Sequence, residues 1–125
     1  MLVEHCEQSL KRLGTDYIDL YMVHCPITLK VIGHFTTETM ECPKVDDIFA
    51  ALRKLKEERK VRYLGISNFA PNKLKEALDT QTDLVINELP YNLLCRTIEY
   101  EIMLYCIEKG VGILVVFPPI NWTVS

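Results

Sequence analysis

The stretch DYIDLYMVHCP, from Asp16 to Pro26, decides the fold. Its middle is apolar and rich in β-branched and aromatic residues, and a proline ends it, which is the pattern of a buried strand in a parallel sheet. We therefore predict a strand from about Tyr17 to His24. The titratable His24 falls at the carboxyl end of that strand. In α/β architectures the carboxyl ends of parallel strands form the functional face.

A second stretch, VRYLGISNF from Val61 to Phe69, has the same layout, with an apolar run that ends in Ser67 and Asn68. A hydroxyl and an amide at a strand end could hold a polar ligand. Ser-Asn after a strand is equally a signal for a turn or a helix cap. A histidine at a strand end, such as His24, can likewise be satisfied by backbone groups alone, so the residues themselves leave both readings open.

Helical and strand patterns alternate along the rest of the chain. Such alternation predicts an α/β fold in which the strands are parallel. A loop on the functional face is expected over residues 28–43, with His34 solvated, and an irregular tail over 120–125. The other predicted elements are helices at Leu2–Leu13, at Val45–Arg59, from Pro71 and from Thr97 to Gly110, and strands at Val61–Ile66, Leu84–Leu89 and Val111–Phe117.

Two helix ends carry specific expectations. The first helix has apolar residues at three- and four-residue steps, which predict one buried stripe that includes Leu13. Gly14 suits the left-handed position that closes a helix. Thr97 can cap the last helix, although Tyr100 stands where a capping box would have Glu or Gln. The complete predicted stripe of the first helix is Val3, Cys6, Leu10 and Leu13.

Three segments together resemble the aldo-keto reductase family: Ser9–Pro26 (SLKRLGTDYIDLYMVHCP), Lys60–Phe69 (KVRYLGISNF) and Asn87–Leu94 (NELPYNLL). The resemblance continues to about Pro118. It implies a (β/α)8 TIM barrel that reduces aldehydes or ketones by hydride transfer from NADP(H). A complete barrel usually needs about 250 residues, whereas this chain has 125. We therefore expect a single domain, residues 1–125, forming a partial barrel of about four consecutive βα units from its middle to late part.

The resemblance also implies roles for particular residues. His24 matches the family's active-site histidine, which orients the substrate carbonyl and tunes the neighbouring acid. Ser67 and Asn68 match the pair that holds the nicotinamide carboxamide of NADP(H). Glu88 falls where many members carry Gln for the same carboxamide. A carboxylate accepts hydrogen bonds but donates none unless it is protonated.

The sequence departs from the family pattern at two further places. Val116 stands where many relatives carry an aromatic ring that stacks on nicotinamide, and Phe117 lies one residue further along. A shift of one residue on a strand turns the side chain to the other face, so whether Val116 or Phe117 can replace that ring stays open. Arg59 stands where a Gly usually precedes Lys-Val-Arg, which weakens the expected helix stop.

Composition narrows the remaining possibilities. The net charge of −3 argues against a nucleic-acid partner, which would favour a basic face. Neither a run of 18 apolar residues nor a signal peptide is recognisable, so we expect no membrane partner. Five cysteines without a CxxC pair predict reduced thiols in a cytoplasmic protein. Zinc binding by His24, Cys25 and Cys42 is the alternative, but their spacing is not that of a zinc finger, and we expect no metal.

The family's catalytic Tyr, Asp and Lys lie in barrel units that have no counterpart in this sequence. No Gly-rich phosphate loop of a known type occurs either. We therefore expect a fragment that is inactive by itself and binds NADP(H) weakly. The alternatives are a non-enzymatic half-barrel, which forms a homodimer or aggregate through exposed strand edges or docks on a full-length relative, and a residual nucleotide-binding module.

Overall fold

The computed structural model of the chain describes residues 2–27 and 43–116. The predictions for His34, Cys42, Phe117 and the tail 120–125 lie outside these residues. Helices and strands alternate as the sequence predicts. In chain order the elements are α1 (Leu2–Leu13), β1 (Ile18–Val23), α3 (Val45–Glu57), β2 (Val61–Ser67), α4 (Pro71–Asp79), β3 (Leu84–Pro90), the 3-10 turn η1 (Thr97–Glu99), α5 (Ile102–Lys109) and β4 (Gly112–Val116).

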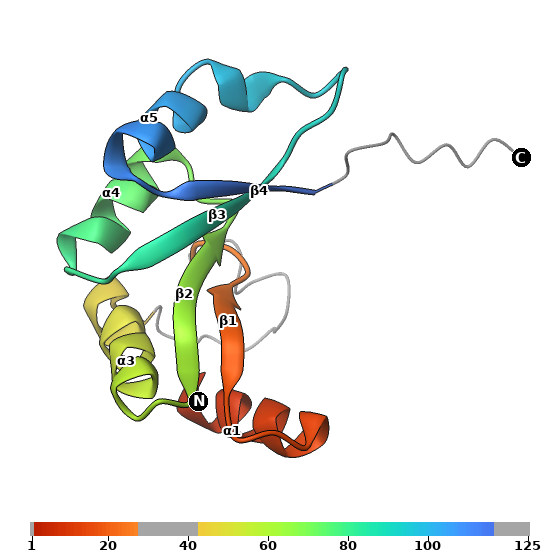
Figure 1. The fold of residues 1–125 in the computed structure, drawn as a ribbon. Coiled ribbons are helices and arrows are strands. Elements are labelled where there is room, and N and C mark those ends of the chain that lie inside the picture. Colours follow the sequence, from red (N-terminus) through yellow and green to blue (C-terminus); the bar gives the residue numbers. More distant parts are fainter. Residues whose placement is uncertain (1, 28–42, 117–125) are drawn as a thin grey trace, which may run out of the picture.

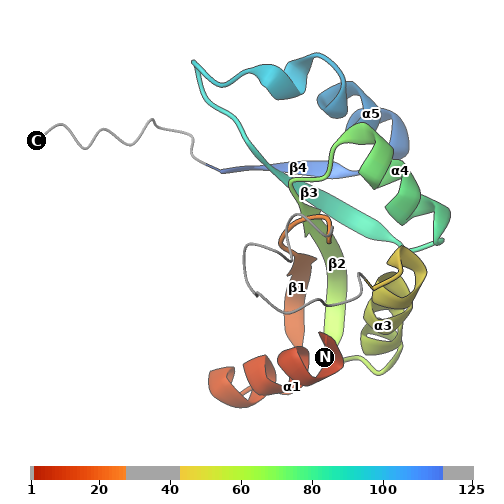
Figure 2. The same ribbon diagram turned by 180° about the vertical axis from the view of Figure 1, so that it is seen from behind.

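The strands form one parallel sheet with the order β1-β2-β3-β4 (Figure 1). Each strand thus lies beside its neighbours in the sequence, as expected when a helix connects consecutive parallel strands. Helices α3, α4 and α5 lie along one face of the sheet, and the view from behind shows the same arrangement (Figure 2). The predicted α/β class with parallel strands is therefore confirmed.

The register between β2 and β3 shifts by one residue within the pairing. Leu64 lies opposite Leu84, whereas Gly65 lies opposite Ile86. Val85 is therefore an extra residue on β3, as in a β-bulge. Beyond the shift, Ser67 lies opposite Glu88.

The glycine at this shift is required by space. A Cβ atom added to Gly65 would lie 2.8 Å from Cγ2 of Ile86 and 2.8 Å from Cγ of Met22. Those two side chains belong to the neighbouring strands and close over Gly65 from both sides. Glycine inside a strand is typical of such a close approach.

The core lies between the sheet and the helix layer. Helix α3 buries Phe49, Leu52 and Leu55 at helical spacing, and β2 buries Leu64 against them. The opposite face of the sheet is open among the described residues, because Tyr63 is 51% exposed and Leu114 39% exposed there. Apolar side chains on that face therefore remain available for contact.

Two predictions about helix ends are wrong. The side chain of Leu13 is 69% exposed, because α1 packs on α3 and its last turn extends away from that helix (Figure 1). Thr97 does not cap the last helix: it begins η1, and α5 starts only at Ile102 without a capping side chain. Without a Glu or Gln at Tyr100, the reciprocal bond of a capping box cannot form.

Arg59 occupies the position that glycine usually takes after a helix. Its φ is 60°, in the left-handed region, and the amides of Arg59 and Lys60 donate to the carbonyls of Lys56 and Leu55 over 3.0 Å. These two bonds form a Schellman motif, which closes α3 in spite of the arginine. A non-glycine residue pays a steric penalty in this conformation. The predicted helix Val45–Arg59 accordingly ends at Glu57.

We predict that Arg59→Gly raises the free energy of unfolding by about 0.5–1 kcal/mol, because glycine adopts a positive φ without that penalty. The control is Glu57→Gly, two residues earlier in the helix, which should lower stability by about 0.5–1 kcal/mol. Urea unfolding measures both. Equal destabilisation by the two variants would contradict this account of the helix end.

Candidate functional site

The carboxyl ends of β1, β2 and β3 bring the predicted site residues together. Val23 lies opposite Ile66, and Ser67 opposite Glu88, so the residues that follow β1 and β2 meet beside the end of β3. His24, Ser67, Asn68 and Glu88 all belong to this edge of the sheet. His24, Ser67 and Asn68 lie at strand ends as the sequence predicts, and Glu88, singled out through the family resemblance, lies beside Ser67 two residues before the end of β3. Their roles in the site stay predictions.

Ser67 is the buried member of the group, with 2% of its surface exposed. Its hydroxyl lies 3.2 Å from the carbonyl oxygen of Glu88 and 3.3 Å from the Glu88 carboxylate, and donates its one proton to these acceptors. The hydroxyl oxygen accepts a hydrogen bond from the Asn68 side-chain amide over 3.0 Å. Ser67 therefore links the amide of Asn68 to the carboxylate of Glu88.

Asn68 turns the chain away from β2. Its φ is 60°, a left-handed conformation that Asn tolerates better than most residues. Its backbone amide donates to the carbonyl of Glu88 over 2.9 Å, and its side-chain amide donates to the backbone carbonyl of His24 over 3.1 Å. His24 thus joins the network through its backbone, while its side chain is exposed.

The remaining capacity of these groups matches a primary carboxamide. Both Asn68 Nδ2 protons are used, and no hydrogen bond to Asn68 Oδ1 is found within the described residues. Asn68 Oδ1 and the half-buried Glu88 carboxylate can accept the two protons of an amide NH₂. The Ser67 hydroxyl can donate to the amide oxygen if it turns away from Glu88. The site therefore fits a carboxamide group.

Val116 lies on the same face as Glu88. It pairs with Pro90, two residues beyond Glu88, and its carbonyl accepts a hydrogen bond from the Tyr91 amide over 3.2 Å. Because strand side chains alternate, Val116 and Glu88 point to one side of the sheet. The half-buried Val116 thus offers an aliphatic surface on the same face of the sheet as the carboxylate.

Asn87 is a polar residue that the sequence analysis did not single out. It is fully buried in the middle of β3, and its side-chain amide donates to the carbonyl of Phe69 over 2.9 Å. Its side-chain oxygen accepts from the amide of Phe69 over 3.4 Å. A polar residue inside an otherwise apolar strand was the available signal, since a buried amide needs partners.

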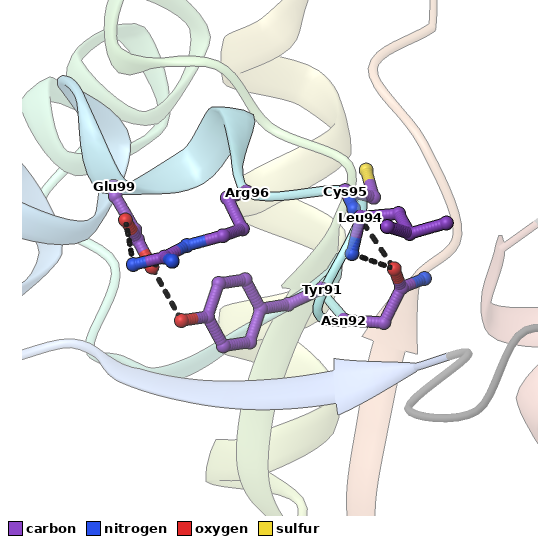
Figure 3. Close-up of polar contacts among 6 residues, drawn as sticks. All are labelled: Tyr91, Asn92, Leu94, Cys95, Arg96 and Glu99. Carbon is purple, nitrogen blue, oxygen red and sulfur yellow. Dashed lines mark hydrogen bonds and ion pairs between the residues drawn. The ribbon is translucent and has the colours of Figure 1, made fainter.

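The loop after β3 has its own polar network (Figure 3). The guanidinium of Arg96 donates two hydrogen bonds to the Glu99 carboxylate, over 2.9 and 3.0 Å, and the Tyr91 hydroxyl donates to the same carboxylate. The Asn92 side-chain oxygen accepts from the amides of Leu94 and Cys95 over 2.9 and 2.8 Å. These bonds shape the segment between β3 and η1.

A cavity of about 580 Å³ opens on the outer side of the Asn68 turn. Its walls are mainly apolar and include Phe69, Leu89, Ile98 and Ile102. Of the four network residues only Asn68 lines this cavity, and His24, Ser67 and Glu88 do not. We assign it no ligand.

The described residues contain neither a cluster of metal-binding side chains nor a membrane-spanning helix. No group of three or more His, Cys, Asp and Glu side chains there could hold a metal ion. No described helix combines the length and the apolar character needed to cross a bilayer. The described cysteines, Cys6, Cys25, Cys95 and Cys106, are free thiols.

Comparison with known proteins identifies the fold's relatives. The sequence model of the Aldo/keto reductase family matches residues 1–121. The chain belongs to the aldo/keto reductase family. It is 29% identical over 121 residues to an aldehyde reductase of Saccharomyces cerevisiae, covering 83% of this chain and 38% of the relative. It is 35% identical over 108 residues to a glyoxal reductase of Bacillus subtilis, covering 86% of this chain and 33% of the relative.

Solved aldo/keto reductases confirm the partial barrel. An aldo/keto reductase of Klebsiella pneumoniae in complex with NADP and acetate superposes with a TM-score of 0.75 at 25% identity, covering 93% of this chain and 37% of that one. A glycerol dehydrogenase of Gluconobacter oxydans gives a TM-score of 0.76 at 30% identity, covering 91% and 31%. The chain thus spans about a third of the length of these family members, and its strands correspond to part of a (β/α)8 barrel.

We predict that the Glu99 network makes the stability of this family member depend on pH. The hydrogen bonds from Arg96, followed by the one from Tyr91, lower the pKa of Glu99. A carboxyl whose pKa is lowered by folding stabilises the protein fully above its unfolded pKa, and this contribution disappears as the pH falls through the folded value. Glu99→Gln should therefore reduce the free energy of unfolding at neutral pH, and the difference from the wild type should vanish in acid.

Urea unfolding at neutral pH and at about pH 3 measures this difference. Glu101→Gln is the matched control, because Glu101 is exposed and lies two residues further on. Its effect should be small at both pH values. A Glu99→Gln effect that is the same at both pH values would contradict the ionic origin of the network.

Proposed function

We propose that this chain forms the part of an NADP(H)-dependent carbonyl reductase that holds the nicotinamide end of the cofactor. The observation that carries the proposal is the polar network of Ser67, Asn68, Glu88 and the His24 backbone at the strand ends of an aldo/keto reductase chain. A solved relative contains NADP, which supports this cofactor for the whole protein.

In this proposal Ser67, Asn68 and Glu88 bind the nicotinamide carboxamide. Asn68 Oδ1 and the Glu88 carboxylate accept the two amide protons, and the Ser67 hydroxyl donates to the amide oxygen. Val116 provides an aliphatic surface on the same face of the sheet. Each polar atom of the carboxamide then has a partner, which favours one orientation of the ring.

His24 has the proposed role of orienting the substrate carbonyl. Its exposed side chain follows β1 directly beside the Asn68 turn, and its backbone carbonyl is fixed by the Asn68 amide. Imidazole can donate a hydrogen bond to a carbonyl oxygen and tune a neighbouring acid near neutral pH. The nicotinamide supplies the hydride when it is bound.

The substrate proposed for the whole protein is a small aldehyde or ketone. Relatives of this chain include an aldehyde reductase, a glyoxal reductase and an NADH-specific methylglyoxal reductase. The names of these relatives all describe the reduction of a carbonyl compound, and they differ in the compound named. We also propose a cytoplasmic location, which the free thiols of the described cysteines support.

We predict that the 125-residue chain binds NADPH no more tightly than the millimolar range, equivalent to about −4 kcal/mol, because only groups for the nicotinamide end are assigned to it. Glu88→Gln should bind several-fold more tightly than the wild type, because an amide can also donate to the carboxamide oxygen. Titration followed by fluorescence measures both. A micromolar Kd for the wild type would contradict the prediction.

We predict that the same chain alone does not reduce carbonyl compounds. The family's catalytic Tyr, Asp and Lys have no assigned counterparts in it, and a general acid alone contributes about 10²–10⁴-fold to rate. NADPH oxidation with a panel of aldehydes is the assay. Turnover that survives purification and is lost in His24→Ala would show that the chain is a complete catalyst.

A second candidate function is non-enzymatic self-association. It is favoured by the open face of the sheet, where Tyr63 and Leu114 are exposed, and by the strands β1 and β4 at the two edges. Exposed strand edges and apolar faces invite pairing with another chain. Two copies that meet edge to edge would cover both features in a closed symmetric dimer. Docking on a full-length relative is the heteromeric form of the same idea.

We predict that the isolated 125-residue chain is a dimer or an aggregate. Light scattering coupled to size-exclusion chromatography measures its mass. Leu114→Lys should shift the population toward monomer, because it places a charge on the open face. Ile107→Lys is the control, because Ile107 is 67% exposed on α5, away from that face. A soluble wild-type monomer that unfolds cooperatively would refute self-association.

A further inference from the structure

A fully buried amide lies directly behind the candidate site. Asn87 has no exposed surface and occupies the middle of β3. Burying an amide is costly unless its polar atoms find partners. Both polar atoms of the Asn87 side chain have a partner. Its Nδ2 donates to the Phe69 carbonyl over 2.9 Å, and its Oδ1 accepts from the Phe69 amide over 3.4 Å. A weaker contact of 3.9 Å joins Nδ2 to the sulfur of Cys106.

Asn87 cannot touch a ligand held by Glu88. The two residues are consecutive on a strand, so their side chains point to opposite faces. Glu88 binds Ser67, whereas Asn87 points toward the helix layer and contacts Cys106 of α5. The hydrogen bonds that link the Asn87 side chain to the site run to the backbone of Phe69.

Phe69 is the residue that ends the Asn68 turn. Its ring is buried and meets the ring of Phe49 edge to face, with centroids 6.4 Å apart and planes at 78°. Its two backbone polar groups are both bound by Asn87. Phe69 is thus held through its ring by Phe49 and through its backbone by Asn87.

The turn itself needs such support. Asn68 has a left-handed φ of 60°, and a non-glycine residue keeps this conformation only where its surroundings fix it. On one side of Asn68, Ser67 belongs to β2 and faces Glu88. On the other side Asn87 fixes Phe69. Two consecutive residues of β3 therefore hold the turn from both faces of the sheet.

We propose that Asn87 is a positioning residue for the carboxamide site. By binding both backbone polar groups of Phe69 it fixes the left-handed turn, and the turn aims the Asn68 side chain at Ser67 and the His24 carbonyl. That the turn serves to bind a carboxamide rests on the proposed function. The positioning itself rests on the contacts of Asn87 with Phe69, and the test separates the two.

The test compares Asn87→Leu with Leu74→Ala in the full chain. Leucine has the same branching and the same number of side-chain heavy atoms as asparagine, but it can bind neither polar group of Phe69. Leu74 is a fully buried residue of α4, and its truncation lowers stability without touching those groups. Hydrogen–deuterium exchange, resolved to residues 67–70 and 61–66, reports the turn and the body of β2 separately.

In Asn87→Leu, residues 67–70 should exchange roughly 10- to 100-fold faster relative to residues 61–66, as expected when a buried hydrogen bond is lost. In Leu74→Ala the ratio between the two segments should stay at its wild-type value. An unchanged ratio in Asn87→Leu would overturn the inference, because Asn87 would then support the fold as a whole and not the turn.

Two further measurements keep the result decisive. If Asn87→Leu does not fold, the wild type answers the question: a Phe69 amide that exchanges as fast as an exposed one would overturn the inference, and protection equal to that of β2 would support it. Nicotinamide mononucleotide, observed by saturation-transfer NMR, tests the purpose. Its binding should weaken about tenfold in Asn87→Leu but not in Leu74→Ala. A wild type that does not bind it would refute the proposed function, while the exchange ratio still decides the positioning.

Discussion

The one-residue shift in the pairing of β2 with β3 determines the arrangement of the candidate site. Before the shift Leu64 lies opposite Leu84, and with that register Ser67 would meet Asn87. After the shift Ser67 meets Glu88. Because side chains alternate along a strand, this single step decides which residue faces Ser67 and which lies behind the sheet. The missing side chain of Gly65 makes the step possible, since Ile86 and Met22 close over it.

The two ends of the sheet are built from different interactions. At the amino ends of the strands, charged pairs dominate: Lys60 binds Glu7 of α1 and Glu58, and Arg62 binds Asp19. The hydrogen bonds that the Lys60 ammonium donates to Glu7 and Glu58 raise the pKa of Lys60. Exposed pairs of this kind contribute little to stability individually. At the carboxyl ends the contacts are hydrogen bonds of Ser67 and Asn68, which fix the orientation of these two side chains. In barrels of this type the carboxyl face carries function and the amino face carries stability.

Much of the fold could be predicted from the sequence, because it depends on local patterns. The alternation of elements, Gly14 and Gly110 at left-handed helix ends, and Pro71 in the first turn of α4 all follow from spacing and backbone chemistry. The positions of His24, Ser67 and Asn68 at one edge follow from the parallel order of the strands, whereas Glu88 was singled out only through the family resemblance. Their assigned roles came from the family resemblance and stay proposals.

The parts that could not be predicted depend on contacts between distant residues. The register shift is set by how Ile86 and Met22 pack over Gly65, which no single segment reveals. Asn87 was passed over because its partner, Phe69, lies 18 positions away in the sequence. The exposure of Leu13 depends on where α1 ends relative to α3, and periodicity gives only the face of a helix, not its neighbours.

The central claim is that the network of Ser67, Asn68 and Glu88 recognises a carboxamide. The most direct test compares nicotinamide mononucleotide with its carboxylate analogue, nicotinic acid mononucleotide, by saturation-transfer NMR at matched concentrations. The two ligands differ only in the group that this network would bind. We predict that the carboxamide ligand binds and the carboxylate does not, because Glu88 and Asn68 Oδ1 are acceptors and would repel it. Equal binding of the two ligands, or binding of the carboxylate alone, would contradict the account.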